Sequence, residues 1–328
     1  MQNAFLGSLV ADALAMPVHW YYDVEAMDSD YGPINGYLSP HNPHPNSILW
    51  RSHYNPASRK ADILHGQKIY WGKRGIHYHQ NLQAGENTLN LQLASELYRH
   101  VISEGIFKID NWLKRYIEVM LTPNWHNDTY VEEYHRTFFL NYERGIPLRS
   151  CGAKDLHIGA LSMIPSLLAG LEAIGKEEIS YLLESVFSLV SATHNHTLSI
   201  RTASDFSRIL VHLSRGFGIR DTLSELPIAG VSVRDLKKWE KLDDRFVVGE
   251  KLSTACYLPQ SFLAALHFAW KYHDDFQKAI VANAESGGDS CHRGVVVGSI
   301  VASQTGIPDS LINELRMMEN LKCDLHKT

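Results

Sequence analysis

The sequence predicts an all-α fold, on three observations. Apolar residues recur at helical spacing over long segments, as in residues 88–105, where one stands at every fourth position from Leu89 to Val101. Runs in which apolar and polar residues alternate, as in a half-buried strand, are nearly absent, and residues 244–252 are the best candidate. Small residues recur at four-residue spacing near both ends of the chain, which favours helices in close contact.

Signals for helix ends support the individual elements. Residues 109–123 combine Asp110 as a candidate N-cap, an amphipathic body and Pro123 as a stop signal. Residues 176–194 and 258–273 show the same apolar periodicity. We therefore expect a helix in each of these segments.

Two helices carry the small-residue stripes. The stripe of the N-terminal helix consists of Gly7, Ala11 and Ala15, and that of a helix near the C-terminus consists of Gly294, Gly298, Ala302 and Gly306. Residues four apart lie on one face of a helix, so each stripe forms a smooth surface. We expect the two helices to pack closely in the centre of the fold.

Residues 28–80 differ from the rest, because they are rich in Pro, His, Asn, Ser, Gly and Tyr. Such a long irregular segment in a compact domain is typical of a lid or binding loop. We expect it to border the functional cleft, with His77 or His79 at the rim. The remaining sequence shows no repeat or linker, so one domain is expected over residues 1–328.

The composition excludes several classes of protein. The 328 residues are 45% hydrophobic and 20% charged, as in an ordinary globular protein. The net charge of -5 provides no basic footprint for nucleic acid or an anionic membrane. No apolar run approaches the ~20 residues of a membrane span, and the N-terminus is a poor signal peptide. Four scattered cysteines predict reduced thiols in a cytoplasmic protein: Cys151, Cys256, Cys291 and Cys323.

Two glycines introduce the C-terminal striped helix. Gly287 and Gly288 can adopt backbone angles closed to other residues, so they predict a tight turn that delivers Asp289 and Ser290 to the helix start. Either residue can cap the helix, and a carboxylate in this position can equally be a ligand. Asp12, one residue off the N-terminal stripe, is either a buried hydrogen-bonded aspartate or a functional group in the same region.

Two further polar clusters stand at helix ends. Glu86, Asn87 and Thr88 lie at the head of a predicted helix, where Asn87 or Thr88 is the expected cap and an oxygen-rich ligand set is the alternative. His194 and His196 lie between two helices. Without a third histidine at ligand spacing, this pair favours loop structure or a substrate contact over a metal site.

Taken in order, these segments resemble motifs of the ADP-ribosylglycohydrolase family, which includes the dinitrogenase-reductase-activating glycohydrolases and the J1-crystallins. GSLVADALAMPVHW is similar to the family's opening helix, and AGENTLNLQLA stands where the family carries Thr-Asp-Asp-Thr. DLHIGALSMIP resembles the central glycine-rich motif, and THNHTLSI resembles the Thr-His motif. NAESGGDSCHRG resembles the terminal motif, Asn-x-Gly-Gly-Asp-Thr-Asp-Thr. The resemblance spans Gly7 to Gly306 and implies the family's single orthogonal multi-helix domain.

The resemblance also shows where this chain departs from the family. Active members hold two magnesium ions between two acidic segments, which here read Gly85-Glu86-Asn87-Thr88 and Asp289-Ser290-Cys291-His292. One carboxylate has become an amide and another a thiol, which is a poor magnesium ligand. We therefore expect no two-magnesium site, and at most one weakly bound magnesium ion on Glu86, Asn87, Thr88 and Asp289. A softer metal on Cys291 and His292 is disfavoured, because neighbours on a helix point about 100° apart.

Three classes of function follow from the resemblance. The first is a glycoside hydrolase acting on an ADP-ribosyl or ribosyl-type bond, in a small molecule or an ADP-ribosylated substrate, with Glu86 or Asp289 orienting water. Its expected substrate contacts are Asp12, His194, Ser290 and Arg293. The second class is a non-catalytic binder of ADP-ribose or another nucleotide, and the third is a structural protein of the J1-crystallin kind, the branch whose motifs GENT and GGDS resemble most.

Overall fold

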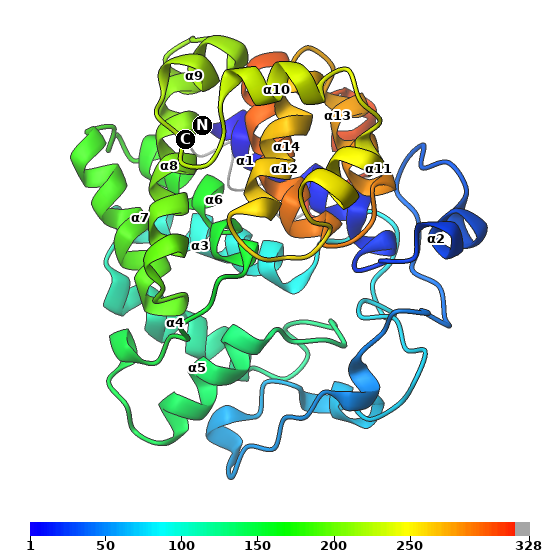
Figure 1. The fold of residues 1–328 in the computed structure, drawn as a ribbon. Helices are drawn as coiled ribbons and strands as arrows, with labels where there is room; N and C mark the ends of the chain where they lie inside the picture. The colour runs from blue at the N-terminus through cyan, green and yellow to red at the C-terminus, as the bar shows by residue number, and fades with distance from the viewer. Residues whose placement is uncertain (319–328) are drawn as a thin grey trace.

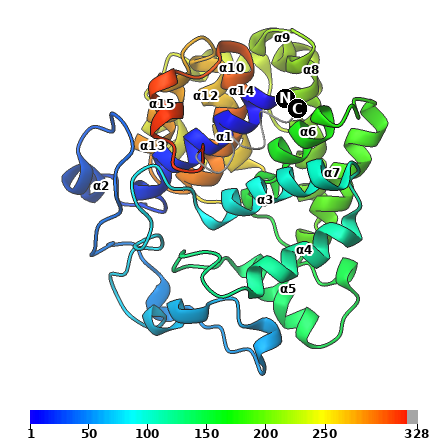
Figure 2. The ribbon, with the colours of Figure 1, turned by 180° about the vertical axis from the view of Figure 1, so that it is seen from behind.

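The computed structural model describes residues 1–318, and its centre is a pair of helices from the two ends of the chain. α1 (Gln2–Ala15) and α14 (Ser290–Thr305) lie side by side and are buried over most of their length (Figure 1, Figure 2). A Cβ atom added to Gly298 would lie 2.2 Å from the carbonyl oxygen of Gly7, so only glycine permits this approach. The close packing predicted from the two stripes is confirmed.

Six helices surround this pair: α3 (Leu89–Glu104), α6 (Ile164–Ala173), α7 (Ile179–Thr193), α8 (Thr197–Ser214), α12 (Gln260–Lys271) and α13 (Phe276–Glu285). α12 and α13 pack against α14, and α6 packs against both α1 and α3. α7 and α8 pack against each other, and α8 also contacts α14. The helices predicted at residues 88–105, 176–194 and 258–273 correspond to α3, α7 and α12 and are confirmed.

The remaining elements form the periphery. The helices are α2 (Val24–Tyr31), α4 (Ile109–Leu121), α5 (Glu133–Glu143), α9 (Ile219–Glu225), α10 (Val233–Trp239), α11 (Asp244–Phe246) and α15 (Asp309–Glu314). Short 3-10 turns lie at Met16–Val18, Leu49–Arg51, Arg59–Ala61, His65–Tyr70, Leu148–Ser150 and Ile158–Leu161. Within residues 1–318 the structure contains isolated bridges but no β-strand, which confirms the all-α prediction.

The prediction that residues 244–252 are the best candidate for a strand is wrong. α11 and the π-helix Val247–Lys251 occupy this segment. The cause is local, since the side chain of Asp243 accepts a hydrogen bond from the backbone N–H of Phe246 at 3.0 Å and so caps a helical turn. The apolar residues that suggested a strand, Val247 and Val248, are both buried within this helical turn.

Helix ends were predicted with mixed success. α3 ends before Gly105, whose φ of +65° is the left-handed conformation that favours glycine. α4 ends at Leu121, two residues before Pro123. However, α4 begins after Lys108, and Asp110 lies in its first turn, where it pairs with Arg149 at 2.6 Å instead of capping the helix. The cap prediction for Asp110 is therefore wrong.

The irregular segment at residues 28–80 takes the expected form. After α2 ends at Tyr31 it contains only short 3-10 turns, and it runs from α2 down one side of the molecule in blue and light blue (Figure 1). Its residues Ile48, Arg51 and Tyr78 line the cleft described below. The segment therefore borders this cleft, whereas His77 and His79, expected at its rim, are both buried and do not line it.

Two further expectations concern membrane-spanning helices and the state of the cysteines. Among residues 1–318, no helix has the length and apolar character required to cross a membrane. Cys151, Cys256 and Cys291 are free thiols. Cys323 lies outside the described residues.

Replacing Gly298 by Ala is expected to destabilise the protein by at least about 2 kcal/mol, because the new methyl group would meet the backbone of α1 rather than a flexible side chain. Urea denaturation measures this loss. Gly36→Ala is the matched control, since a Cβ atom there meets nothing within 4 Å and φ is not positive. Equal stabilities for the two variants would show that α1 and α14 do not approach as closely as described.

Candidate functional site

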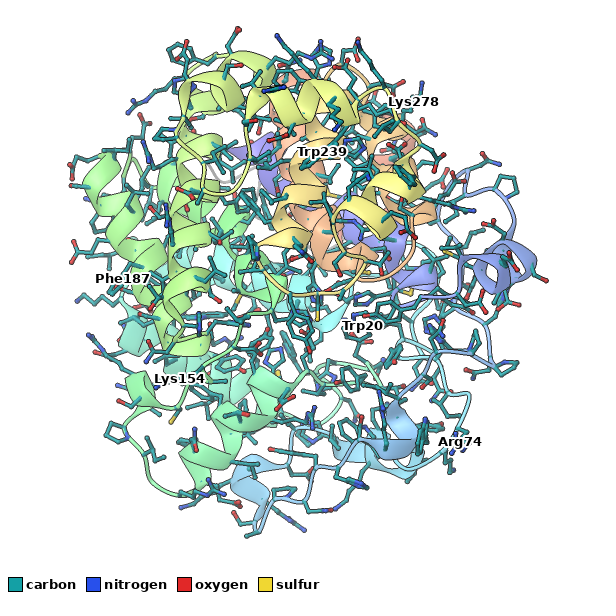
Figure 3. The ribbon with its side chains drawn as sticks, in the orientation of Figure 1. Trp20, Arg74, Lys154, Phe187, Trp239 and Lys278 are labelled. Atoms are coloured by element: carbon teal, nitrogen blue, oxygen red, sulfur yellow. The ribbon has the colours of Figure 1, made fainter. Side chains whose placement is uncertain are left out.

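A cleft of about 370 Å³ opens where the helical part of the molecule meets the irregular segment. It is lined by Trp20, Tyr22, Ile48, Arg51, Tyr78, Tyr130, Glu132, Glu133, Asp155, His157, Ala255, Cys256 and Tyr257. These residues come from the turn after α1, the irregular segment, the start of α5 and the loops before α6 and α12. Figure 3 labels Trp20 at this junction.

Aromatic side chains form one wall of the cleft. The ring of Trp20 meets Tyr78 and Tyr130 edge to face, with centroids 4.6 and 5.2 Å away. Trp20 has a φ of +63°, which is unusual for a residue with a large side chain. Its backbone N–H donates to the carbonyl of Gly288 at 2.8 Å, so the glycine turn before α14 holds it in this conformation.

Asp289 lies directly behind the cleft and is fully buried. One carboxylate oxygen, Oδ1, contacts Nε2 of His19 at 3.0 Å and Nδ1 of His292 at 2.7 Å. The other oxygen, Oδ2, lies 3.5 Å from Nε2 of His157 and has no hydrogen-bond partner within the described part of the chain. Burial alone would raise the pKa of Asp289, but His292, His19 and His157 hold it well below its usual value.

His292 joins Asp289 to Glu132 at the cleft. Its Nε2 atom lies 3.0 Å from Oε1 of Glu132, so both ring nitrogens face carboxylates and both donate hydrogen bonds. Although burial favours a neutral ring, Asp289 and Glu132 raise the pKa of His292 well above its usual value. Burial also opposes ionisation of Glu132, but His292 and His157 lower its pKa well below the usual range. His292 is therefore a buried imidazolium between two carboxylates.

A second pair of histidines extends this chain away from the cleft. Nδ1 of His19 lies 2.7 Å from Nε2 of His79, whose Nδ1 lies 2.5 Å from Oδ1 of Asp128. The two rings thus bond to each other and to one carboxylate at each end, and this pattern needs three protons on four nitrogens. The pair carries one positive charge. Burial lowers the pKa of His19 to about 3.

The charged state of His292 makes stability depend on pH. Because its pKa is raised by folding, its contribution is complete below about pH 6.5 and is lost as the pH rises through the folded value. The free-energy cost of His292→Asn is therefore expected to be larger near pH 6 than near pH 9, by up to about 1.4 kcal/mol per pH unit titrated.

Urea denaturation of wild type and variant across this range measures the difference. The variant must be compared with the wild type at each pH because other histidines also make stability depend on pH. Burial lowers the pKa values of His19, His44 and His135 to about 3, 4 and 3, so their contribution to stability is lost as the pH falls. An equal cost of His292→Asn at both pH values would contradict a charged His292.

The residues expected from the first acidic segment separate in the structure. Asp12 accepts hydrogen bonds from Nδ2 of Asn87 at 2.9 Å and from the hydroxyl and backbone N–H of Thr88 at 2.8 and 2.9 Å. Thr88 occupies the N-cap position of α3 but makes no side-chain cap bond. Glu86 instead accepts from the backbone N–H of Gln83 at 2.8 Å and lines a separate cavity of about 380 Å³. The structure does not bring Glu86 together with Asp289.

The residues expected around the second segment are mostly buried behind the cleft. Asp289 caps α14, as one of the two expected alternatives, and the hydroxyl of Ser290 faces the carbonyls of Ala15 and Val18 at 3.5 and 3.4 Å. Arg293 is fully buried and donates to the carbonyl of Gly287 and to Asn283. Neither Ser290 nor Arg293 lines the cleft.

His194 lies close to the cleft but does not line it. Its Nδ1 atom is 3.0 Å from the hydroxyl of Thr193, its ring centroid is 4.1 Å from that of Tyr134, and its Nε2 atom has no hydrogen-bond partner. Burial holds the pKa of His194 well below its usual value, so the ring is neutral.

Sequence reasoning missed the cleft residues that carry charge. Glu132, His157 and Asp155 were not singled out, although His157 and Asp155 lie within the quoted segment DLHIGALSMIP. Glu132 stands immediately before α5, and the available signal was that acidic residues are favoured at the N-terminus of a helix. His19, at the end of the quoted first motif, was also overlooked.

The magnesium ions that the family resemblance implies do not fit this set of donors. The only carboxylate of the second segment, Asp289, bonds to two imidazole rings. Asn87 turns its amide nitrogen, not its oxygen, toward Asp12. Magnesium requires oxygen ligands in a near-octahedral arrangement, whereas the groups nearest Asp289 supply nitrogen and sulfur.

A softer metal is also disfavoured at the cleft. His157, Cys256 and Asp289 offer ligand atoms within 4.8 Å of one another. However, Nδ1 of His157 accepts a hydrogen bond from the backbone N–H of Gly159 at 2.8 Å. Because Nδ1 accepts this bond, a ring proton lies on Nε2, the atom that would have to bind the ion.

Comparison with known proteins relates this architecture to one family. A model of the family described as ADP-ribosylglycohydrolase matches residues 1–327. Crystallin J1A of Tripedalia cystophora is 27% identical over 323 residues, which cover 94% of this chain and 90% of that protein. A solved structure of an ADP-ribosylglycohydrolase-related protein complex has a TM-score of 0.61 and 17% identity, covers 98% of this chain and 93% of its own, and shares the fold.

Proposed function

The chain belongs to the ADP-ribosylglycohydrolase family, and from this premise we propose that it hydrolyses a ribosyl-type glycosidic bond in the aromatic cleft without the family's two magnesium ions. The main support for this proposal is the position of Glu132. This residue lines the cleft, its side chain is 12% exposed, and its Oε2 atom has no hydrogen-bond partner among residues 1–318. An ionised carboxylate oxygen that is shielded from water and left unpaired is costly, unless it serves a ligand.

The chemical role of Glu132 follows from its charge. Cleavage of a glycosidic bond passes through a transition state in which the sugar ring carries positive charge. A fixed carboxylate beside that ring stabilises the charge in a site with little water. Because its pKa is lowered, Glu132 is a weak base. It therefore orients the attacking water and stabilises the cation, and the water loses its proton once the new bond has formed.

His157 and the buried chain act on Glu132 rather than on the sugar. Nδ1 of His157 lies 3.5 Å from the unpaired Oε2, and His292 donates to the other oxygen. The imidazolium of His292 keeps Glu132 ionised and fixes its plane. Glu132 is thus a candidate catalytic residue, whereas His292 and Asp289 are positioning residues.

Sugar release from ribosyl compounds tests this function. Chelator-treated protein is incubated with an ADP-ribosylated peptide, free ribonucleosides and a pyridinium N-riboside, and free sugar is measured by chromatography. We expect turnover of at least one substrate by the wild type and by the exposed control Glu177→Gln. Binding without any turnover would instead support the alternative of a non-catalytic binder.

Magnesium binding tests the claim that the protein does not hold two magnesium ions. We expect calorimetric titration of the wild type to show no two-ion binding, because Asn87 and Cys291 supply no negative charge to offset a second ion. The variant with Asn87→Asp and Cys291→Asp is expected to gain affinity for magnesium. Two ordered ions in a crystal of the unmodified protein would contradict this expectation.

A further inference from the structure

The charges that line the cleft differ from those that a diphosphate ligand needs. Glu132, Glu133 and Asp155 supply three carboxylates, and Arg51 supplies the one guanidinium. Behind the cleft, the positive charges of His292 and of the His19–His79 pair are each matched by neighbouring carboxylates, and the buried Arg293 donates to Asn283 and to the carbonyl of Gly287. The charged side chains that line the cleft therefore sum to a net negative charge, which disfavours anions.

Aromatic rings supply the second requirement for binding a cation. Tyr22 and Tyr257 line the mouth of the cleft and remain 45% and 61% exposed, which is unusual for such large side chains. Behind them stand the packed rings of Trp20, Tyr78 and Tyr130. The face of an aromatic ring attracts a cation by about 0.5–2 kcal/mol, and flat aromatic ligands stack on it.

We propose that the cleft binds a flat organic cation of the pyridinium type, and that the substrate is a riboside whose leaving group is such a cation. The claim that the cleft binds such a cation depends only on the residues that line the cleft. The claim that the riboside is hydrolysed rests on the proposed function and names its substrate class.

The reaction matches the groups that the cleft provides. The bond between C1 of the sugar and the ring nitrogen breaks, and its electron pair neutralises the nitrogen, so the leaving group departs as a neutral pyridine. No proton donor is needed. The oxygen of water bonds to C1 and releases a proton to the solvent, while Glu132 stabilises the positive sugar ring. The two carboxyl groups whose pKa is raised, Asp12 and Asp205, do not line the cleft, so neither is placed to donate a proton to a leaving group.

Binding of three probes tests the ligand class without relying on turnover. The probes are 1-methylnicotinamide, which is a cation; nicotinamide, which is its neutral analogue; and ADP-ribose, which is an anion. Calorimetry on the wild type is expected to show that the cation binds at least about tenfold more tightly than nicotinamide, equivalent to about 1.4 kcal/mol. ADP-ribose is expected to bind more weakly than the cation.

Charge variants locate the binding site. Glu133→Gln and Asp155→Asn are each expected to weaken binding of 1-methylnicotinamide severalfold, and Arg51→Gln is expected to strengthen it, because each change removes one charge from the lining. Glu177→Gln, at an exposed residue that does not line the cleft, is the matched control and is expected to leave the affinity unchanged.

Equal affinity for 1-methylnicotinamide and nicotinamide, no binding of the cation, or tighter binding of ADP-ribose would each overturn the inference. Failure of the proposed function gives a different result: the cation binds and responds to the charge variants, but no riboside is hydrolysed. Hydrolysis of neutral or anionic ribosides by a protein that does not bind the cation would leave the proposed function standing and remove this inference.

Discussion

Replacing Asp289 by Asn is expected to lower the free energy of unfolding by about 3–5 kcal/mol, which is the usual cost of removing one partner from a buried ion pair. Asp289 is fully buried, and its Oδ1 atom holds both His19 and His292. An amide keeps the size of the side chain but leaves the imidazolium of His292 with one carboxylate instead of two. Urea denaturation near neutral pH measures the loss.

Two comparisons isolate the electrostatic part of this effect. Asp274→Asn changes an aspartate whose side chain is 77% exposed and is expected to alter stability by less than about 0.5 kcal/mol. In the double variant Asp289→Asn with His292→Asn, the two losses are expected to be less than additive, because both remove the same interaction. A loss below about 1 kcal/mol in Asp289→Asn would show that the buried chain does not carry its assigned charges.

Replacing Glu132 by Gln is expected to lower kcat for sugar release by about 10²- to 10⁴-fold, since the variant lacks the charge that stabilises the transition state. KM is expected to change only severalfold, because the amide has the same shape as the carboxylate and the change removes one of the three carboxylate charges that line the cleft. Initial rates over a range of substrate concentrations separate the two constants.

Glu132→Asp provides the matched comparison. It keeps the negative charge but withdraws it by one methylene group, so it is expected to retain more activity than Glu132→Gln. A Glu132→Gln variant that folds normally and hydrolyses as fast as the wild type would remove Glu132 from the mechanism. Circular dichroism and urea denaturation establish that the variants are folded.

The features that the sequence predicted are local ones. The stripes of α1 and α14 could be identified because residues four apart necessarily share a helix face, and Gly7 and Gly298 meet as expected. The turn at Gly287 and Gly288 could be identified because glycine adopts positive φ angles that other residues rarely adopt, and both residues have a φ of +67°. In each case the physical cause lies within a few neighbouring residues.

The buried chain of histidines and carboxylates could not be predicted in this way. His19, His79, Asp128 and Glu132 come from separate segments, and each alone is an ordinary polar residue in a turn or at a helix end. Their charges depend on mutual contacts that exist only after folding, since an isolated histidine is largely neutral at pH 7.

Adjacent residues also proved poor guides to a shared site. Glu86 and Asn87 are neighbours in sequence, yet Asn87 bonds to Asp12 inside the protein while Glu86 bonds to the backbone of Gln83 and lines another cavity. The irregular backbone before α3 points successive side chains in different directions. Motif resemblance located this helix end correctly, but it could not assign each side chain to the cleft.

Sugar release by metal-free protein tests the central claim most directly. The protein is treated with a chelator, its metal content is verified by elemental analysis, and the rate of sugar release from a pyridinium N-riboside is compared before and after addition of magnesium. We predict the same rate in both conditions, because His292 and the His19–His79 pair supply positive charge in the buried site and Glu132 acts from the cleft. A rate that is absent without magnesium and restored by it would contradict this account.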